Sequence, residues 1–207
     1  MRGRGFFLVL DGPDRSGKST QARLLAEFLG RRKIPFLLTR EPGGSALSEI
    51  IRKVLLDRRI RIGPLAELFL YEAARAQHVE ETILPALRRG RLVICDRFSP
   101  ATYAYQACGR GLDPRRVEGV DRWARGGVAA DLAIVIDVPE SGFRRRGKRE
   151  GADRMERESA SFRRKVREGF RSYARRHRRV LLVDGSQGVE KTHSMIVEAL
   201  SKSGGLG

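Results

Sequence analysis

The sequence has few residues of the kinds that build metal centres or disulfide frameworks. Its 207 residues include two cysteines and three histidines. Cys95 and Cys108 are too few and too far apart to indicate a disulfide framework, and the histidines lack the spacing of metal ligands. We therefore expect neither kind of centre.

Long apolar runs are missing as well. No stretch approaches the ~20 consecutive apolar residues of a membrane-spanning helix, and the N-terminus leads directly into a predicted strand without the pattern of a signal peptide. The chain is nevertheless 41% hydrophobic, which is enough to bury a full core. We expect a soluble cytoplasmic protein with no membrane partner.

Acidic residues are outnumbered, 25 against 42 basic ones, and the net charge is +17. Such an excess is typical of nucleic-acid-binding proteins, but it also suits an enzyme with anionic nucleotide substrates or a general bias toward arginine. Aromatic residues make up only 7% of the chain and do not interleave with the basic runs, as single-strand binding would favour. Nucleic acid is therefore not expected to be the main partner.

One stretch carries a specific signal. Residues 12–19 read Gly-Pro-Asp-Arg-Ser-Gly-Lys-Ser, which matches the phosphate-binding loop pattern. The apolar run 6–10 before it predicts a strand, and the apolar spacing up to Gly30 predicts a helix. Backbone N–H groups of such a loop bind phosphate at the helix N-terminus. In this pattern Lys18 reaches the β- and γ-phosphates, and Ser19 binds Mg²⁺.

Predicted strands and helices alternate along the rest of the chain. Further strands are predicted at 34–38, 92–95, 132–137 and 180–185. Helices are predicted at 45–56, from 64 towards 87, from Thr102, and at 114–124, 161–179 and 190–200. The alternation predicts a three-layer α/β fold with a five-stranded parallel sheet and helices on both faces. Because no linker is visible, we expect one domain over residues 1–207.

Charged loops follow the predicted strands at the edge where parallel sheets bind ligands. Residues 40–44 read Arg-Glu-Pro-Gly-Gly, and Asp96 closes a strand directly before Arg97. An acidic residue in that position holds Mg²⁺ or anchors the neighbouring arginine. We therefore assign the metal to Ser19 and Asp96.

The phosphate loop alone identifies a nucleotide-binding protein but not its reaction. The Asn-Lys-x-Asp element of GTPases is missing from the sequence. A small chain with arginine-rich loops at strand ends suits a kinase of a small anionic acceptor. Two alternatives stay open, namely a kinase that acts on another nucleoside or nucleotide, and a phosphate-loop ATPase that DNA or RNA stimulates.

The ordered set of motifs resembles the thymidylate kinase family, in the nucleoside monophosphate kinase group of P-loop kinases, over essentially the whole chain. The resemblance is carried by residues 11–21, 40–44, 66–70, 74–75, 96–98, 104–106, Pro114 and 153–156. It implies transfer of the γ-phosphate of Mg-ATP to dTMP, which gives dTDP for dTTP biosynthesis. It also implies a homodimer joined through helices, for which segments 65–87 and 102–108 are candidates.

For ATP, the resemblance implies binding by the phosphate loop and by a lid over residues 144–156. The loop residues concerned are Gly12, Pro13, Asp14, Arg15, Ser16, Gly17, Lys18, Ser19 and Thr20. In the lid, Arg145 and Arg149 would contact the nucleotide. The catalytic residues implied are Asp14, Arg15, Lys18 and Arg97. Either Arg15 or the basic lid residues can neutralise the transition state.

For the sugar and phosphate of dTMP, the resemblance implies four contacts. Asp14 would bind the 3′-hydroxyl, and Tyr105 would crowd a 2′-hydroxyl. Arg40 and Arg97 would bind the acceptor phosphate through their forked guanidinium groups. Structural ion pairs for the two arginines, and a core position for Tyr105, stay open as alternatives.

For thymine, the resemblance implies stacking by Phe69, a contact from Arg75 to the carbonyl edge, and a contact from Gln106. Phe69 also fits an ordinary core stripe. Pro100-Ala101 replaces a segment that often carries serine, so we expect a hydroxyl contact to be missing. The Arg-Glu-Pro loop implies a cis peptide bond between Glu41 and Pro42, although only about 5–6% of such bonds are cis.

A first prediction concerns which arginine stabilises the transition state. Arg15 lies in a predicted strand–turn–helix, whereas the resemblance places Arg149 in a lid that would have to be ordered at each turnover. We expect Arg15→Gly to lower kcat by roughly 10²-fold or more with little change in ATP affinity. Arg149→Ala should mainly weaken ATP binding, in a salt-dependent way. Steady-state kinetics test this prediction. A larger loss of kcat in Arg149→Ala than in Arg15→Gly would assign stabilisation of the transition state to the lid.

Overall fold

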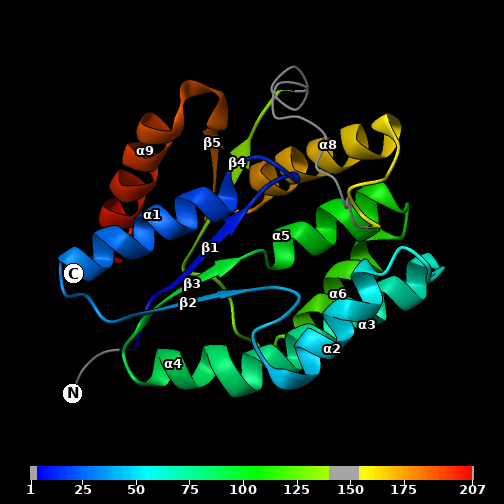
Figure 1. The fold of residues 1–207 in the computed structure, drawn as a ribbon, viewed down its shortest axis with the longest axis horizontal. Coiled ribbons are helices and arrows are strands. Elements are labelled where there is room, and N and C mark those ends of the chain that lie inside the picture. The colour runs from blue at the N-terminus through cyan, green and yellow to red at the C-terminus, as the bar shows by residue number, and fades with distance from the viewer. Residues whose placement is uncertain (1–3, 140–153, 207) are drawn as a thin grey trace.

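The structure is a computed structural model that describes residues 4–139 and 154–206. Its centre is a five-stranded parallel sheet in the order β2-β3-β1-β4-β5 (Figure 1). The strands are β1 (Phe7–Asp11), β2 (Phe36–Arg40), β3 (Leu92–Asp96), β4 (Leu132–Asp137) and β5 (Val180–Asp184). The α/β fold with a five-stranded parallel sheet is confirmed.

Side chains of the central strand enter two separate cores because both faces of the sheet are covered. In β1, Leu8 and Leu10 join one core cluster, and Phe7 and Val9 join the other. All four side chains are fully buried. A strand buried on both faces reads as a continuous apolar run, which is how it could be found in the sequence.

Two groups of helices form the outer layers. The first face is covered by α1 (Lys18–Arg31) and α9 (Val189–Lys202), with η3 (Gly185–Gln187) leading into α9. The second face carries the π-helical turn η1 (Val79–Ile83), α4 (Leu84–Arg88), α5 (Ser99–Thr102), the π-helical η2 (Tyr103–Gly109) and α8 (Ala160–Arg176). The expected three layers are therefore present.

Three further helices lie together beside the carboxyl end of β2, on the opposite side of the sheet from α1 and α9 (Figure 1). They are α2 (Ala46–Leu56), α3 (Pro64–His78) and α6 (Pro114–Ala124), with α3 packed between the other two. The helix after β3 begins at Ser99, three residues before the expected Thr102. Pro100 is compatible with this first turn because its missing N–H would have no helical partner there.

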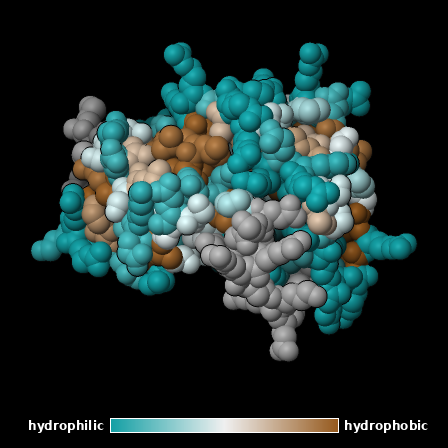
Figure 2. Space-filling view, turned by 90° about the horizontal axis from the view of Figure 1, so that it is seen from above, coloured by the Kyte–Doolittle hydropathy of each residue, from teal (hydrophilic) through white to brown (hydrophobic). Residues whose placement is uncertain are grey.

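None of the helices in the described part of the chain combines the length and the apolar character needed to cross a bilayer. Seen from above, the surface is mostly hydrophilic, with separate hydrophobic patches between the polar areas (Figure 2).

The carboxyl ends of all five strands place a charged residue at one edge of the sheet. These last residues are Asp11, Arg40, Asp96, Asp137 and Asp184. The register aligns Asp96 with Arg40 on one side and with Leu10 on the other. The loops that follow β1, β2 and β3 therefore meet at this edge.

The contact between α8 and η2 leads to a stability prediction. A Cβ atom on Gly169 would lie 2.9 Å from the Cα atom of Ala104, whereas one on Gly119 in α6 would meet nothing within 4 Å. Alanine is favoured over glycine in helices by about 1 kcal/mol, but overpacking costs about 1–3 kcal/mol. We expect Gly119→Ala to raise the Tm and Gly169→Ala to lower it in thermal unfolding. An equal rise in both variants would show that the α8–η2 contact has spare room.

Candidate active site

The phosphate loop connects β1 to α1 as expected. Gly12 has φ 137°, and a Cβ atom there would lie 2.4 Å from the carbonyl oxygen of Ile136, so glycine is required. The Lys18 side chain folds back over the loop, and its Nζ donates to the carbonyl oxygens of Gly12 (3.0 Å) and Pro13 (2.8 Å). Burial, together with nearby Arg97, lowers the pKa of Lys18 to about 8. A bound phosphate would favour the charged lysine.

Two oxygen donors lie side by side at the start of α1. The hydroxyl of Ser19 donates to Oδ2 of Asp96 over 2.8 Å. Mg²⁺ prefers such hydroxyl and carboxylate oxygens and is usually held by one or two side chains together with substrate phosphates. The donor set at Ser19 and Asp96 therefore fits Mg²⁺.

Arg97 joins the phosphate loop to the loop after β3. Its guanidinium donates to the Asp14 carboxylate and to the carbonyl oxygen of Gly12 (3.2 Å), and it lies over the ring of Tyr105. The Tyr105 hydroxyl donates to Oδ2 of Asp14 over 2.8 Å. Although burial alone would raise the pKa of Asp14, Arg97 and other nearby groups hold it below its ordinary value. The φ of 76° at Arg97 is uncommon for a residue with a side chain, and such residues cluster at functional sites.

Asp11 accepts hydrogen bonds from the backbone of the same two loops. Its Oδ1 accepts from the backbone N–H of Gly12 (2.9 Å), and its Oδ2 accepts from those of Phe98 (3.2 Å) and Ala101 (2.9 Å). Burial raises the pKa of Asp11 to about 6. One carboxylate therefore fixes the phosphate loop relative to the start of α5.

A cavity of about 110 Å³ opens beside Asp14 and Arg97. Its lining includes predicted acceptor residues, namely Asp14, Arg75, Arg97, Tyr105 and Gln106. For the other lining residues the sequence predicts no contact with the substrate. They are Glu41, Pro42, Arg52, Leu56, Tyr71, Ala101, Thr102 and Met155. The cavity thus brings together five residues that the resemblance assigned to dTMP.

Phe69, the expected stacking residue, does not line the cavity, and 53% of its surface is exposed. Tyr71 lines it instead. At 3.6 residues per turn, Tyr71 lies about 40° around α3 from Arg75, whereas Phe69 lies about 120° away. The expectation for Phe69 is therefore wrong in this structure, and the helical spacing from Arg75 is the signal that points to Tyr71.

Arg40 does not reach the cavity either. Its guanidinium donates to both carboxylate oxygens of Glu49 in α2, at 2.9 and 3.0 Å. This structural ion pair replaces the expected position beside the acceptor phosphate. The peptide bond between Glu41 and Pro42 is cis, as predicted. Thr102 lines the cavity, but its hydroxyl bonds to Arg75 (2.9 Å) and Glu72 (3.1 Å), so the missing hydroxyl contact to the substrate stays a prediction.

The lid prediction can be followed only at its carboxyl end. Arg145 and Arg149 lie outside the described residues. In the phosphate loop, Arg15 has φ 60° and its Nη2 lies 3.9 Å from Oε2 of Glu156. The loop and the end of the lid segment are therefore adjacent, while the division of work between Arg15 and the lid stays a prediction.

Glu67 anchors this end of the lid segment. Its buried carboxylate pairs with Nη1 of Arg154 (2.6 Å) and accepts hydrogen bonds from Gln106 (2.9 Å) and Arg110 (2.9 and 3.0 Å). Burial acts to raise the pKa of Glu67, but bonds from Arg110 and Gln106 hold it below its ordinary value. Because Gln106 lines the cavity, Glu67 connects the lid segment to the acceptor side.

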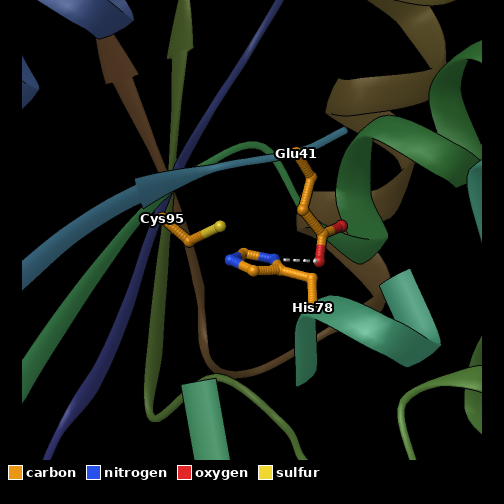
Figure 3. Close-up of side chains that lie close together, drawn as sticks. All are labelled: Glu41, His78 and Cys95. Atoms are coloured by element: carbon orange, nitrogen blue, oxygen red, sulfur yellow. Dashed lines mark hydrogen bonds and ion pairs between the residues drawn. The ribbon is translucent and has the colours of Figure 1, made fainter. Parts of the chain in front are cut away.

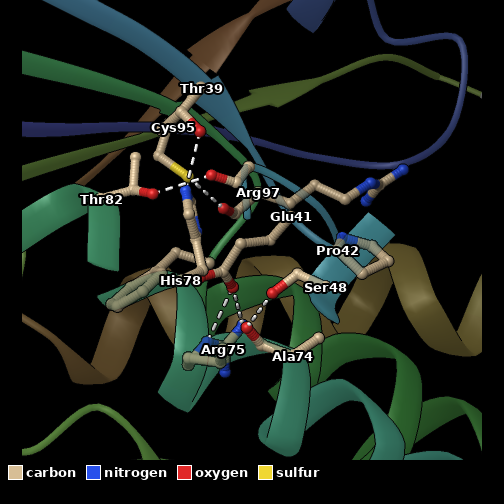
Figure 4. Close-up of polar contacts among 12 residues, drawn as sticks. Thr39, Glu41, Pro42, Ser48, Ala74, Arg75, His78, Thr82, Cys95 and Arg97 are labelled. Carbon is tan, nitrogen blue, oxygen red and sulfur yellow. Dashed lines mark hydrogen bonds and ion pairs between the residues drawn. The ribbon is translucent and has the colours of Figure 1, made fainter. Parts of the chain in front are cut away.

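Arg75 is the centre of a buried ionic network, and Figure 4 shows its contact with one partner, Glu41. Its Nη1 donates to Glu72 (2.8 Å), Asp121 (2.7 Å) and Thr102 (2.9 Å), while Nε and Nη2 pair with Oε2 of Glu41 at 2.8 and 2.7 Å. Three carboxylates thus surround one guanidinium. Burial and the neighbouring carboxylates raise the pKa of Glu72 to about 7, although Arg75 acts to lower it.

Glu41 continues this network to His78 and towards Cys95. Oε1 of Glu41 lies 3.1 Å from Nδ1 of His78, and Nε2 of His78 lies 2.7 Å from Oγ1 of Thr39. Glu41, His78 and Cys95 are buried, and their ligand atoms lie within 4.8 Å of one another. However, Glu41 and Cys95 lie at opposite ends of the imidazole ring (Figure 3), a poor arrangement for one ion. These side chains belong to a hydrogen-bonded network.

Comparisons with known proteins agree on one family. The family model described as thymidylate kinase matches residues 10–196. Thymidylate kinase from Thermoanaerobacter sp. (strain X514) is 42% identical over 96% of this chain and 98% of its own. That from Pelotomaculum thermopropionicum is 45% identical over 95% of this chain and 93% of its own. The crystal structure of thymidylate kinase from Ehrlichia chaffeensis has a TM-score of 0.77 and 30% identity, and the match covers 96% of this chain and 99% of that one.

The crowded carboxylates around Arg75 lead to a prediction about pH. The folded-state pKa of Glu72 is about 7, against 4.5 for a free side chain. Between these values Glu72 is deprotonated in the unfolded state and protonated in the folded state. The contribution of Glu72 to the free energy of unfolding therefore falls as pH rises. Urea unfolding of wild type and Glu72→Gln at pH 5, 6, 7 and 8 should show the variant gaining relative stability as pH rises. A difference that does not change with pH would contradict the prediction.

Proposed function

Because the chain belongs to the thymidylate kinase family and is an ATP-dependent dTMP kinase, we propose how its described residues carry out phosphoryl transfer. The observation that supports the proposal is that the phosphate loop and the acceptor cavity share Asp14 and Arg97. A donor phosphate in the loop and an acceptor phosphate at the cavity mouth would lie on either side of the Arg97 guanidinium.

On the donor side, the loop N–H groups and Lys18 bind the ATP phosphates. Phosphate oxygens replace the carbonyl oxygens of Gly12 and Pro13 as partners of Lys18, whose pKa then rises from about 8. Ser19 and Asp96 would hold Mg²⁺, which would supply further neutralisation of the β- and γ-phosphates.

On the acceptor side, no general base is needed. The second pKa of a phosphate monoester is about 6, so the attacking oxygen of dTMP is already ionised at neutral pH. Catalysis then consists of positioning two polyanions and neutralising their charge. Arg97 and Arg15 provide this charge, and Asp14 orients the sugar through its 3′-hydroxyl.

Arg40 would join the acceptor phosphate by leaving Glu49. The side chains of this pair are 52% and 39% exposed. Exposed ion pairs contribute about 0–1 kcal/mol, so exchanging the carboxylate for a phosphate dianion costs little. This exchange reconciles the implied role of Arg40 with its position in the structure.

The walls of the cavity provide base and sugar selection. Tyr71 stacks on thymine, Arg75 donates to its carbonyl edge, and Gln106 contacts the nucleoside. Arg52, which lines the cavity and donates to the carbonyl oxygen of Pro42 over 2.9 Å, holds the loop at the entrance. Tyr105 occupies the space that a 2′-hydroxyl would need.

We also propose a homodimer joined through α2 and α3. Large apolar side chains on these helices are exposed, namely Leu47 (45%), Ile50 (59%), Leu65 (55%) and Phe69 (53%). Because α2 and α3 pack together, we infer that these side chains form one apolar patch, and such patches mark interaction sites. Segment 102–108 suits this role less well because α8 packs against η2 and buries Tyr103, Ala104 and Tyr105.

The activity is tested by coupling ADP release to an optical signal. Turnover should depend on dTMP and be far lower with dUMP, with dGMP or without an acceptor. Equal ADP release without any acceptor, or stimulation by DNA or RNA instead, would contradict the proposed function.

Substitutions of Tyr71 and Phe69 in α3 test base recognition and dimer formation separately. Tyr71→Ala is expected to raise the KM for dTMP by about 10-fold or more, since base–aromatic stacking contributes about 1–3 kcal/mol. Phe69→Ala should leave that KM nearly unchanged but weaken the dimer, measured by analytical ultracentrifugation. Trp123→Ala, at a residue that is 87% exposed on α6, is the control for both readouts. A larger KM effect in Phe69→Ala would restore Phe69 as the stacking residue.

A further inference from the structure

We propose that His78 is a positioning residue for recognition of the acceptor base: it fixes Glu41, and Glu41 fixes Arg75 at the cavity wall. The inference rests on the proposed role of Arg75 as the residue that contacts the thymine carbonyl edge. His78 itself is the last residue of α3 and is fully buried.

The hydrogen-bond partners of His78 determine which ring nitrogen carries a proton. Oε1 of Glu41, a carboxylate oxygen that only accepts, lies 3.1 Å from Nδ1. We therefore assign a proton to Nδ1, which donates to Glu41. In this tautomer Nε2 accepts from the hydroxyl of Thr39 over 2.7 Å. The ring thus connects the end of β2 to the Glu41 carboxylate (Figures 3 and 4).

The other oxygen of Glu41 sets the position of the Arg75 guanidinium. Oε2 pairs with Nε (2.8 Å) and Nη2 (2.7 Å), on the opposite side from Nη1, which Glu72, Asp121 and Thr102 share. Nη2 carries two N–H groups. Within the described chain its ion-pair partner is Glu41, so the second N–H can serve a ligand in the cavity. A shift of Glu41 would turn that donor away.

The loop that carries Glu41 is packed tightly against the His78 ring. Gly44 has φ 81°, and a Cβ atom there would lie 2.3 Å from Nε2 of His78. Thr82 holds the Gly44 carbonyl oxygen at 2.7 Å, and the backbone N–H of Glu41 donates to the carbonyl oxygen of Asp96 over 2.9 Å. The ring therefore supports the Glu41 side chain within a loop whose backbone is already held.

Two substitutions divide the functions of the two ring nitrogens. In His78→Asn the side-chain amide nitrogen takes roughly the place of Nδ1 and keeps a donor for Glu41. In His78→Gln the longer amide takes roughly the place of Nε2 and keeps an acceptor for Thr39 while the donor to Glu41 is lost. Thr39→Val, which removes only the partner of Nε2, is the matched control.

The readouts are the KM values for dTMP and ATP, kcat, and discrimination against 5-methyl-dCMP. This analogue carries an amino group in place of the C4 carbonyl oxygen of thymine. An N–H donor of Arg75 that binds the carbonyl oxygen would face this amino group and disfavour the analogue. His78→Gln is expected to raise the KM for dTMP and to relax discrimination by about 10-fold each, the effect of losing one hydrogen bond to a charged group. The KM for ATP and kcat should change less than about twofold. His78→Asn and Thr39→Val should stay within about threefold of wild type in every readout.

Equal losses in His78→Asn and His78→Gln, or equal changes in the KM values for dTMP and ATP, would show that His78 only fills the core and would overturn the proposal. A second readout uses the wild-type protein and does not depend on the variants folding. The Nδ1 proton of His78, observed by NMR, should shift on adding dTMP and not on adding ATP alone, and the reverse would also overturn it. If wild type releases no ADP with dTMP, the proposed function fails instead, so the two failures are distinguishable.

Discussion

The acceptor side of this protein depends on one buried guanidinium. Arg75 pairs with Glu41 from the loop after β2, with Glu72 from its own helix and with Asp121 from α6, and it donates to Thr102 at the end of α5. Removing one partner of a buried ion pair typically costs about 3–5 kcal/mol, because the remaining charge is left without compensation. The network therefore fixes four segments relative to one another and presents a preformed cavity wall to the substrate.

The donor side is organised by the sheet. Parallel strands end at one edge, and there Asp11 bonds to the backbone of both the phosphate loop and the loop after β3. Arg97 then lies between the two loops and contacts Asp14. A reaction between two polyanions needs charges that are already in place, because moving them during the reaction would cost reorganisation energy. Arg75 follows this principle as a buried side chain paired with carboxylates, and Arg97 follows it through its pair with Asp14.

Much of this could be predicted from the sequence, because strand formers buried on both faces give short apolar runs and the phosphate loop has a fixed spacing. The cis bond before Pro42 and the cavity positions of Arg75, Arg97, Tyr105 and Gln106 followed from motifs. The errors have physical causes. Phe69 and Tyr71 both fit an apolar stripe, and only their angle to Arg75 around the helix separates them. Arg40 pairs with Glu49 on another helix, and the His78–Glu41 contact joins residues 37 positions apart, so neither shows in a local pattern.

The central claim is that Arg75, held by Glu41, reads the carbonyl edge of thymine in a preformed cavity. A crystal structure with dTMP and a non-hydrolysable ATP analogue tests it most directly. The account predicts thymine against Tyr71, with Nη2 of Arg75 about 2.7–3.2 Å from its carbonyl oxygen and the Glu41 pair intact. A base seated against Phe69, or an Arg75 side chain that leaves Glu41 to reach the ligand, would contradict it.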